Sequence, residues 1–231
     1  MNHINKLEWD TNFFGYDIGK LVVKEDIDIE KFKMEASPYK LVYVFSEKML
    51  HYPDIDLVDK KVVFSKQVSP KNSKENFNHR IELLNPNIHD PSQLVELALQ
   101  SGVYSRFKLD TNFKDQEYIK LYSEWINKCM DRKSEFDILV ALKGNNITGF
   151  TTLSKVSEEL ADIGLVAVDQ NLRGEGIGTE LLSKTILRAS QKGFKNIQVV
   201  TQMNNLPAVK LYEKLKFDIQ EITFVFHYWN L

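Results

Sequence analysis

The chain has 231 residues, of which 43% are apolar and 27% charged, as in a globular protein long enough for one large domain or two small ones. Its net charge of −2 excludes a general attraction to nucleic acid or to an anionic membrane. No apolar run approaches the ~20 residues of a membrane-spanning helix, and the polar first ten residues are unlike a secretory signal. The single cysteine, Cys129, excludes an internal disulfide, and the five scattered histidines predict no metal site. We therefore expect a cytoplasmic protein.

The first third of the chain alternates short apolar runs with one amphipathic segment. Residues 18–23, 39–45 and 60–66 are rich in β-branched and aromatic residues and predict strands, and residues 27–35 predict a helix. A polar stretch around Pro70 has no apolar periodicity, which predicts a linker at residues 69–78. Residues 1–68 are therefore expected to form a small mixed α/β domain that docks on the rest of the chain.

Residues 79–231 show a longer alternation of strand and helix patterns. The helix at residues 90–102 is expected to have Asp90 as its N-cap, and the turn KGNN predicts a hairpin within residues 136–156. The remaining predicted elements are strands at 79–85, 159–168, 196–202 and 222–229 and helices at 115–130, after the turn at 174–178, and at 206–217. This order predicts an α/β (mixed α+β) fold, with a central mixed sheet flanked by helices.

Three glycines, Gly174, Gly176 and Gly178, lie in the turn between the predicted strand at 159–168 and the helix that follows. Free amides at a helix start, the helix dipole and the small size of glycine together favour a phosphate group at such a turn. A P-loop would need a lysine that the turn lacks, and the dinucleotide fingerprint would need glycine in place of Thr179. A surface turn without a ligand is the alternative interpretation.

Two patches together resemble the GCN5-related N-acetyltransferase (GNAT) superfamily. The first is R-G-x-G-x-G at residues 173–178, and the second is Asn, two residues, Ala, two residues, Leu-Tyr, then Lys and Phe at residues 205–217. The resemblance implies a GNAT fold over residues 79–231, a degenerate copy of it over residues 1–68, and acetyl-CoA as cofactor. One departure is Lys216, where the family usually has glycine, which puts the tight turn after the helix in doubt.

The resemblance also implies roles for individual residues. Backbone amides of the glycine turn would hold the pyrophosphate of coenzyme A, and a bulge in the preceding strand would free backbone groups for the pantetheine arm and the thioester oxygen. The cofactor-binding residues implied are Val166, Ala167, Val168, Arg173, Gly174, Glu175, Gly176, Ile177, Gly178, Thr179, Asn205 and Ala208.

For the chemistry, Tyr212 shares a helix face with Asn205 and Ala208, and its phenol can give a proton to a leaving thiolate. A tyrosine of the core is the alternative interpretation. The candidates for the general base, all left open, are Glu158, Glu159, Asp162 and His227.

The acceptor is suggested by stretches outside these patches. Residues 7–21, 104–107, 200–205 and 226–229 resemble the TDP-fucosamine branch of the superfamily, which acetylates an amino sugar linked to a nucleotide for cell-surface polysaccharide. A nucleotide sugar needs an aromatic face for its base and a cation for its diphosphate. The candidate substrate-binding residues are Arg106, Tyr104, Phe107, Trp9 and Phe14.

Several alternatives stay open at this point. Core packing would explain the aromatic candidates, and an ordinary surface cation would explain Arg106. The acceptor could instead be a protein N-terminus, a lysine or an aminoglycoside, or the chain could bind acyl-CoA without catalysis. The sequence leaves a homodimer open.

Overall fold

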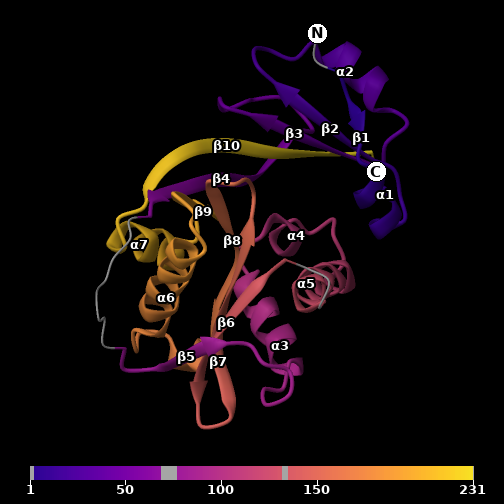
Figure 1. Ribbon diagram of the computed structural model, residues 1–231. Helices are drawn as coiled ribbons and strands as arrows, with labels where there is room; N and C mark the ends of the chain where they lie inside the picture. The colour runs from indigo at the N-terminus through magenta and orange to yellow at the C-terminus, as the bar shows by residue number, and fades with distance from the viewer. Residues whose placement is uncertain (1–2, 69–76, 132–134, 231) are drawn as a thin grey trace. The chain divides into compact units, whose positions relative to one another are not determined.

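The computed structural model describes residues 3–68, 77–131 and 135–230 of the chain (Figure 1). These residues form two compact units that interleave along the sequence. The first unit is Met1–Val62, Gln202–Asn204 and Glu221–Leu231, and the second is Val63–Thr201 and Asn205–Gln220. Two long strands, β4 (Asp56–Gln67) and β10 (Asp218–Trp229), contribute residues to both units.

The first unit is a small sheet with a short helix, α2, packed on it. Its strand order is β1-β2-β3-β10-β4, with β2 parallel to β3 and the pairs β1–β2 and β3–β10 antiparallel. Its remaining elements are β1 (Asn5–Lys6), α1 (Glu8–Phe14), β2 (Ile18–Val23), α2 (Ile29–Ala36) and β3 (Leu41–Ser46). Helix α2 connects the parallel strands and buries Phe32 and Ala36 against Val42, Val44 and Phe226.

The second unit is a mixed sheet with helices on both faces. Its strand order is β4-β9-β8-β7-β6-β5, antiparallel from β5 to β8 and parallel between β8 and β9. The strands are β5 (Arg80–Leu83), β6 (Asp137–Lys143), β7 (Asn146–Lys155), β8 (Leu160–Val168) and β9 (Asn196–Gln202). The helices are α3 (Ser92–Ser101), α4 (Arg106–Leu109), α5 (Asp115–Met130), the 3₁₀ turn η1 (Gln170–Leu172), α6 (Ile177–Gln191) and α7 (Leu206–Lys214).

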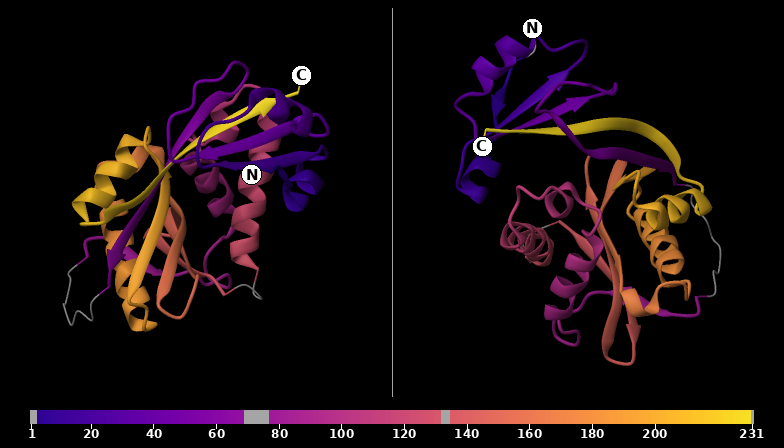
Figure 2. Two further views of the ribbon diagram at one scale, coloured as in Figure 1. Left: turned by 90° about the horizontal axis from the view of Figure 1, so that it is seen from above. Right: turned by 180° about the vertical axis from the view of Figure 1, so that it is seen from behind.

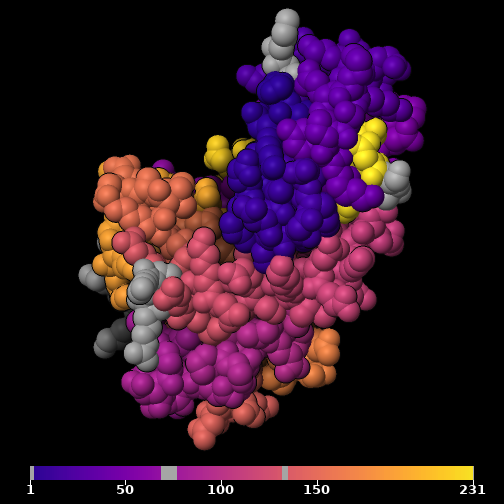
Figure 3. Space-filling view, turned by 90° about the vertical axis from the view of Figure 1, so that its right-hand side faces the viewer, coloured from indigo at the N-terminus to yellow at the C-terminus, as the bar shows by residue number. Residues whose placement is uncertain are grey.

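The helices of the second unit divide into two layers. Helices α3 and α5 cover one face, where Leu94 and Ile126 pack against Phe150, and Figure 3 shows their outer surface in magenta and rose. Helix α6 covers the other face, where Leu181 packs against Leu139, and both views of Figure 2 place α7 beside α6. The predicted mixed sheet flanked by helices is therefore confirmed.

Some local expectations hold and others need correction. Helix α5 and the hairpin of β6 and β7 lie where the sequence predicted them. Helix α3 begins at Ser92 with Pro91 as its N-cap, so the expectation of Asp90 at that position was wrong. The carboxylate of Asp90 still accepts a hydrogen bond from the Ser92 amide at 3.0 Å, because an aspartate just before a helix can bond free amides of the first turn.

The expected division of the chain at residues 69–78 falls largely on residues 69–76, which lie outside the described residues. A separate N-terminal domain at residues 1–68 and an acetyltransferase domain at 79–231 stay predictions. The two units follow another pattern, since residues 221–231 belong with the first 62 residues of the chain. This follows from the pairing of β10 with β3, over Phe224–Trp229 and Ser46–Leu41, which local sequence patterns do not encode.

Candidate active site

The glycine turn of the second unit opens α6. Gly174 and Gly176 have φ angles of 91° and 90°, in the left-handed region that residues with a Cβ avoid. A Cβ added at either glycine would have nothing within 4 Å, so the space beside the turn is open. Within the described chain, the amides of residues 174–179 donate to no main-chain carbonyl. The turn therefore offers free N–H groups at the positive end of a 15-residue helix, which suits an anion.

An acidic residue in the first turn of α6, Glu180, is hydrogen-bonded by its own neighbours. Glu180 accepts hydrogen bonds from the His79 amide at 2.9 Å and from the Asn78 side chain at 3.2 Å, and its carboxylate lies 3.0 Å from His79 Nδ1. Burial alone would raise the pKa of Glu180, but these bonds outweigh it and lower that pKa. The negative charge is thus directed at residues 78–79 rather than at the glycine turn.

Gly178 and Thr179 bring the two sequence patches together. A Cβ at Gly178 would lie 3.2 Å from Cδ2 of Leu211 in α7 and 3.6 Å from Cγ2 of Val168 at the end of β8. Lys214 of α7 donates to the Thr179 hydroxyl at 3.3 Å. Glycine at 178 therefore allows the start of α6, the end of β8 and α7 to pack closely.

Strand β8, which leads toward the turn, contains a bulge. Thr151 pairs with Val166 and Leu153 pairs with Ile163, so one residue of β7, Thr152, faces two residues of β8. Those two residues are Gly164 and Leu165. A bulge of this kind bends a strand and changes which edge its later backbone groups face. The bulge that the sequence was expected to place in this strand is present.

Beyond the bulge, β8 and β9 no longer pair. Their parallel pairing runs from Leu160–Asn196 to Ile163–Val199 among the described residues and stops there. The Asp169 amide bonds the Thr148 carbonyl at 2.9 Å, which fixes the alternation of hydrogen-bonded pairs along β7 and β8.

This alternation means that the N–H and C=O groups of Ala167 are hydrogen-bonded to β7. The N–H and C=O groups of Val166 and Val168 face the opposite edge of β8, on the side of β9. The Val168 carbonyl accepts from Arg173 Nε at 3.2 Å. Arg173 also donates to the Gln100 carbonyl at 3.4 Å, which ties the turn to the end of α3. The open edge thus retains both backbone groups of Val166 and the amide of Val168.

Helix α7 carries the second patch. Asn205 is its N-cap, accepting from the Ala208 amide at 3.3 Å and donating to the Thr201 hydroxyl at 3.3 Å. After the helix, Lys216 adopts the left-handed conformation with φ 59°, and the Phe217 amide bonds the Tyr212 carbonyl at 3.0 Å. The tight turn that the missing glycine put in doubt is therefore made, with lysine in a conformation that favours glycine.

Tyr212 lies within the second unit, with 3% of its surface exposed. Its ring centroid is 5.4 Å from that of Phe64 and 5.9 Å from that of Phe217. This burial raises the pKa of the phenol above its ordinary value, so it stays protonated throughout the neutral range. Both interpretations made from the sequence, a proton donor and a core tyrosine, fit this position, and its catalytic role stays a prediction.

The candidate bases differ sharply in their surroundings. Glu158 and Glu159 are exposed and form ion pairs with Lys155 and Lys195. Asp162, two residues before the bulge, is largely buried, and this burial raises its pKa despite a hydrogen bond from Gln198 Nε2 at 2.9 Å. His227 belongs to the first unit, where it is 1% exposed and its ring lies 5.0 Å from that of Tyr43.

The acceptor candidates fall in both units. In the second, the guanidinium of Arg106 lies 4.5 Å from the centre of the Phe107 ring, and Tyr104 is half-buried. Phe107 is buried and its ring lies 5.3 Å from that of Phe113. In the first unit, Trp9 is 52% exposed and stacks on Phe13 at 4.9 Å, and the half-buried ring of Phe14 lies 5.0 Å from that of Phe13. Their roles in substrate binding stay predictions.

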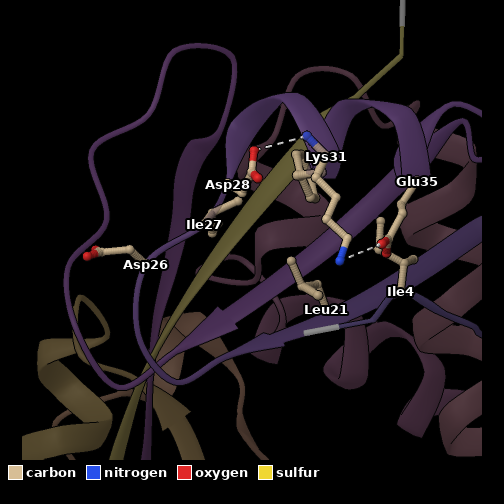
Figure 4. Close-up of a pocket in the computed structure, with 8 residues that line it drawn as sticks. Ile4, Leu21, Asp26, Ile27, Asp28, Lys31 and Glu35 are labelled. Carbon is tan, nitrogen blue, oxygen red and sulfur yellow. Dashed lines mark hydrogen bonds and ion pairs between the residues drawn. The ribbon is translucent and has the colours of Figure 1, made fainter. Parts of the chain in front are cut away.

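The first unit holds a pocket of about 140 Å³ between α2 and the sheet (Figure 4). Its floor is apolar, and its rim carries Asp26, Asp28, Lys31 and Glu35. Asp28 caps α2 by accepting a hydrogen bond from the Lys31 amide at 3.2 Å. A carboxylate of the chain itself therefore occupies the start of α2, where an anion would have to bind. This pocket therefore differs from the glycine turn of the second unit and does not suit a phosphate.

The residues present fit coenzyme A. Left-handed glycines with open space beside them and free amides at a helix start suit a pyrophosphate. The unpaired edge of β8 suits an extended arm that carries amides, because it offers a backbone carbonyl and backbone N–H groups. Among the described residues, no group of three or more His, Cys, Asp and Glu side chains is placed to hold a metal ion, and no helix is long and apolar enough to cross a membrane.

Sequence reasoning missed Gly164 and Thr152. A glycine inside a predicted strand is a known signal for a bulge, and Gly164 within LADIGLVAV carried that signal. Nothing in the local sequence marks Thr152, because its position opposite the bulge depends on the pairing of β7 with β8.

Comparisons with known proteins agree with this geometry. The chain is 26% identical over 148 residues to the spore coat polysaccharide biosynthesis protein SpsD of Bacillus subtilis, covering 64% of this chain and 50% of that protein. It is 29% identical over 126 residues to dTDP-fucosamine acetyltransferase of Escherichia coli, covering 53% and 52%. The chain thus spans about half the length of these curated relatives.

A GCN5-related N-acetyltransferase from Sphaerobacter thermophilus has a similar fold, with a TM-score of 0.57 at 12% identity, covering 90% of this chain and 72% of that one. The sequence model of the acetyltransferase (GNAT) family matches residues 99–217, which include α5, the bulge, the glycine turn and α7. The chain belongs to the acetyltransferase (GNAT) family.

Proposed function

We propose that this chain transfers the acetyl group of acetyl-CoA to the amino group of a nucleotide-linked aminodeoxy sugar, in the synthesis of a surface polysaccharide. The observation that carries the proposal is that two backbone features follow one another along the chain. These are the unpaired edge of β8 and the free amides of residues 174–179. Family membership and the names of two relatives, a dTDP-fucosamine acetyltransferase and a spore coat polysaccharide protein, support the substrate class.

Backbone groups would hold the cofactor along its length. The amides of the turn would bind the pyrophosphate, with Gly174 and Gly176 supplying the left-handed conformations. The Val166 carbonyl and the Val168 amide would bond the arm, in the manner of an added strand. Bound acetyl-CoA supplies the acetyl group as a thioester, whose carbonyl oxygen would accept a hydrogen bond from the Val166 amide.

Two side chains would move protons. We propose Asp162 as the base, because its burial raises the carboxyl pKa and makes it a stronger proton acceptor near neutral pH. It lies two residues before the bulge, with its Oδ2 atom 3.9 Å from the position of a Cβ at Gly164. Tyr212, kept protonated by burial, would give its proton to the departing sulfur.

Because the amine attacks the thioester directly, both substrates must be bound at once. Steady-state rates at varied concentrations of both substrates should then give intersecting double-reciprocal lines. Parallel lines would indicate a covalent acetyl-enzyme and contradict direct transfer.

The decisive experiment compares acceptors. The purified chain is given acetyl-CoA with TDP-4-amino-4,6-dideoxygalactose, the UDP-linked sugar, an aminoglycoside or a peptide with a free N-terminus, and release of free thiol is followed with mass spectrometry of the product. We expect kcat/KM for the nucleotide sugars to exceed that for the other amines by at least about a hundredfold. A preference for the peptide or the aminoglycoside would contradict the substrate class. Thermal stabilisation by acetyl-CoA without turnover on any amine would contradict catalysis itself.

A further inference from the structure

Thr152 of β7 holds the bulge of β8 by a side-chain hydrogen bond. It faces both Gly164 and Leu165, and its hydroxyl oxygen accepts from the Leu165 amide at 2.8 Å. Thr152 is fully buried, so its hydroxyl oxygen is shielded from water. A regular ladder uses only backbone acceptors, and this bond therefore stabilises the bulged arrangement in particular.

Gly164 lets the hydroxyl approach the strand. A Cβ at position 164 would lie 3.0 Å from Oγ1 of Thr152, closer than nearly all contacts of a real Cβ. The Thr152 side chain also partly offsets the rise that burial causes in the pKa of the Cys129 thiol of α5. Thr152 therefore lies where the bulge meets the helix layer that covers this face of the sheet.

The bulge sets the direction of every later backbone group in β8. Without the extra residue at 164–165, the pairing of β8 with β7 would shift by one position, and each residue after it would exchange its two edges. The Val166 amide and carbonyl would then point at β7 rather than at the open edge beside β9. The bulge therefore decides which backbone groups the open edge presents.

We propose that Thr152 is a positioning residue for acetyl transfer, whose hydroxyl locks the Gly164–Leu165 bulge and so directs the Val166 backbone groups to the open edge of β8. This inference rests on the proposed function for its consequence in catalysis. The structural part, that the hydroxyl fixes the bulge, is testable in the protein without any cofactor.

The test uses variants of similar size. Thr152→Val keeps the shape of the side chain but removes the acceptor, whereas Thr152→Ser keeps the acceptor and removes a methyl group. Thr185→Val is the matched control, because Thr185 is also fully buried and hydrogen-bonded, to the Thr151 hydroxyl at 2.6 Å and the Leu181 carbonyl at 2.8 Å, yet does not contact β8 through its hydroxyl. The Thr185→Val variant measures how far the removal of any buried hydroxyl changes amide exchange and kcat.

The first readout is amide hydrogen exchange, followed by NMR in the cofactor-free protein. We expect the Leu165 amide to exchange at least about tenfold faster in Thr152→Val than in the wild type, and at near wild-type rates in Thr152→Ser and Thr185→Val. Unchanged protection of Leu165 in Thr152→Val would overturn the proposal, whether or not the chain turns over acetyl-CoA. A failed acceptor panel with increased exchange would instead overturn the proposed function alone.

The second readout is kinetic. Thr152→Val should lower kcat by about tenfold to a hundredfold, because a small displacement of a reacting group has that effect. It should also weaken the binding of coenzyme A, measured by calorimetry, by about threefold to tenfold, because the Val166 carbonyl no longer bonds the cofactor arm. Thr152→Ser should restore most of kcat. If Thr152→Val does not fold, Gly164→Ala provides the same test with the hydroxyl present, since its methyl group must push Oγ1 away. Equal losses of kcat in the Ser and Val variants, or a wild-type kcat in Gly164→Ala, would contradict the proposal.

Discussion

The glycine turn can be tested by placing one charge where the pyrophosphate is proposed to bind. Gly176→Asp adds a carboxylate at a position whose Cβ would have nothing within 4 Å, so the side chain enters open space without displacing protein atoms. Gly176→Asn is its matched control. Asparagine has nearly the same shape, and both residues tolerate the left-handed conformation, φ 90°, that the turn requires. The difference between the two variants therefore isolates the charge.

The size of the effect follows from Coulomb's law. One pair of unit charges about 4 Å apart repels by about 1 kcal/mol at the dielectric constant of water, and by about 4 kcal/mol at an effective value of 20. Residues 174–176 are exposed, so the lower figure is the better guide. With two charges on the pyrophosphate, we expect Gly176→Asp to bind coenzyme A about 2 kcal/mol more weakly than Gly176→Asn, or about thirtyfold in Kd.

Isothermal titration calorimetry with coenzyme A measures this difference. The gap between the two variants should narrow when salt is raised to about 1 M, where the Debye length falls to about 3 Å. Circular dichroism and thermal melts of both variants confirm that the fold is intact. Equal affinities of the Asp and Asn variants at low salt would exclude residues 174–178 as the phosphate site.

Three further predictions concern the proposed acid, the proposed base and the turn after α7. Tyr212→Phe should lower kcat by about tenfold to a thousandfold with the acetyl-CoA affinity nearly unchanged, and an unchanged kcat would remove the tyrosine from the mechanism. Asp162→Asn should lower kcat by about a hundredfold or more and yet stabilise the fold at neutral pH, because a carboxyl group with a raised pKa makes the wild type less stable as pH rises through that pKa. Chemical denaturation should show that the extra stability of the variant disappears as pH falls below the ordinary carboxyl range. Extra stability that persists at that low pH would contradict the assignment. Lys216→Gly should stabilise the fold by about 0.5–1 kcal/mol, since it removes the strain of a lysine in the left-handed conformation at some cost in conformational entropy. Lys216→Ala should bring no gain in stability. An equal melting temperature of the Gly and Ala variants would refute the reasoning.

Local patterns were sufficient for much of the second unit. Helix α5 spans Asp115–Met130 as its apolar face predicted, and Asn205 and Pro207 mark the start of α7 as a cap and a first-turn proline should. Helix α1 was missed because its N-cap, Leu7, makes no side-chain cap and none of its residues is buried. Helix α4 was missed because four residues carry too little periodicity to detect.

The features that need long-range pairing could not be read from the sequence. The interleaving of the two units depends on the pairing of β10 with β3, whose partners lie about 180 residues apart in the chain. The glycine turn was recognisable because its chemistry is local: the left-handed residues, the free amides and the helix start are all contiguous. The candidate bases could not be separated, because the difference between Asp162 and Glu159 is one of burial, and burial is set by the packing of β8 between β7 and β9.

The bulge shows that the candidate site depends both on local sequence signals and on long-range strand pairing. Gly164 is a local signal, but a glycine in a strand only permits a bulge and does not place it. Its position is fixed by an acceptor, Thr152, on the neighbouring strand, and its effect appears at Val166, whose backbone faces an edge that β9 has left unpaired. A family signature built from the turn and α7 therefore predicts where the cofactor phosphates bind, whereas the proposed placement of the reacting groups depends on a register that three strands determine together.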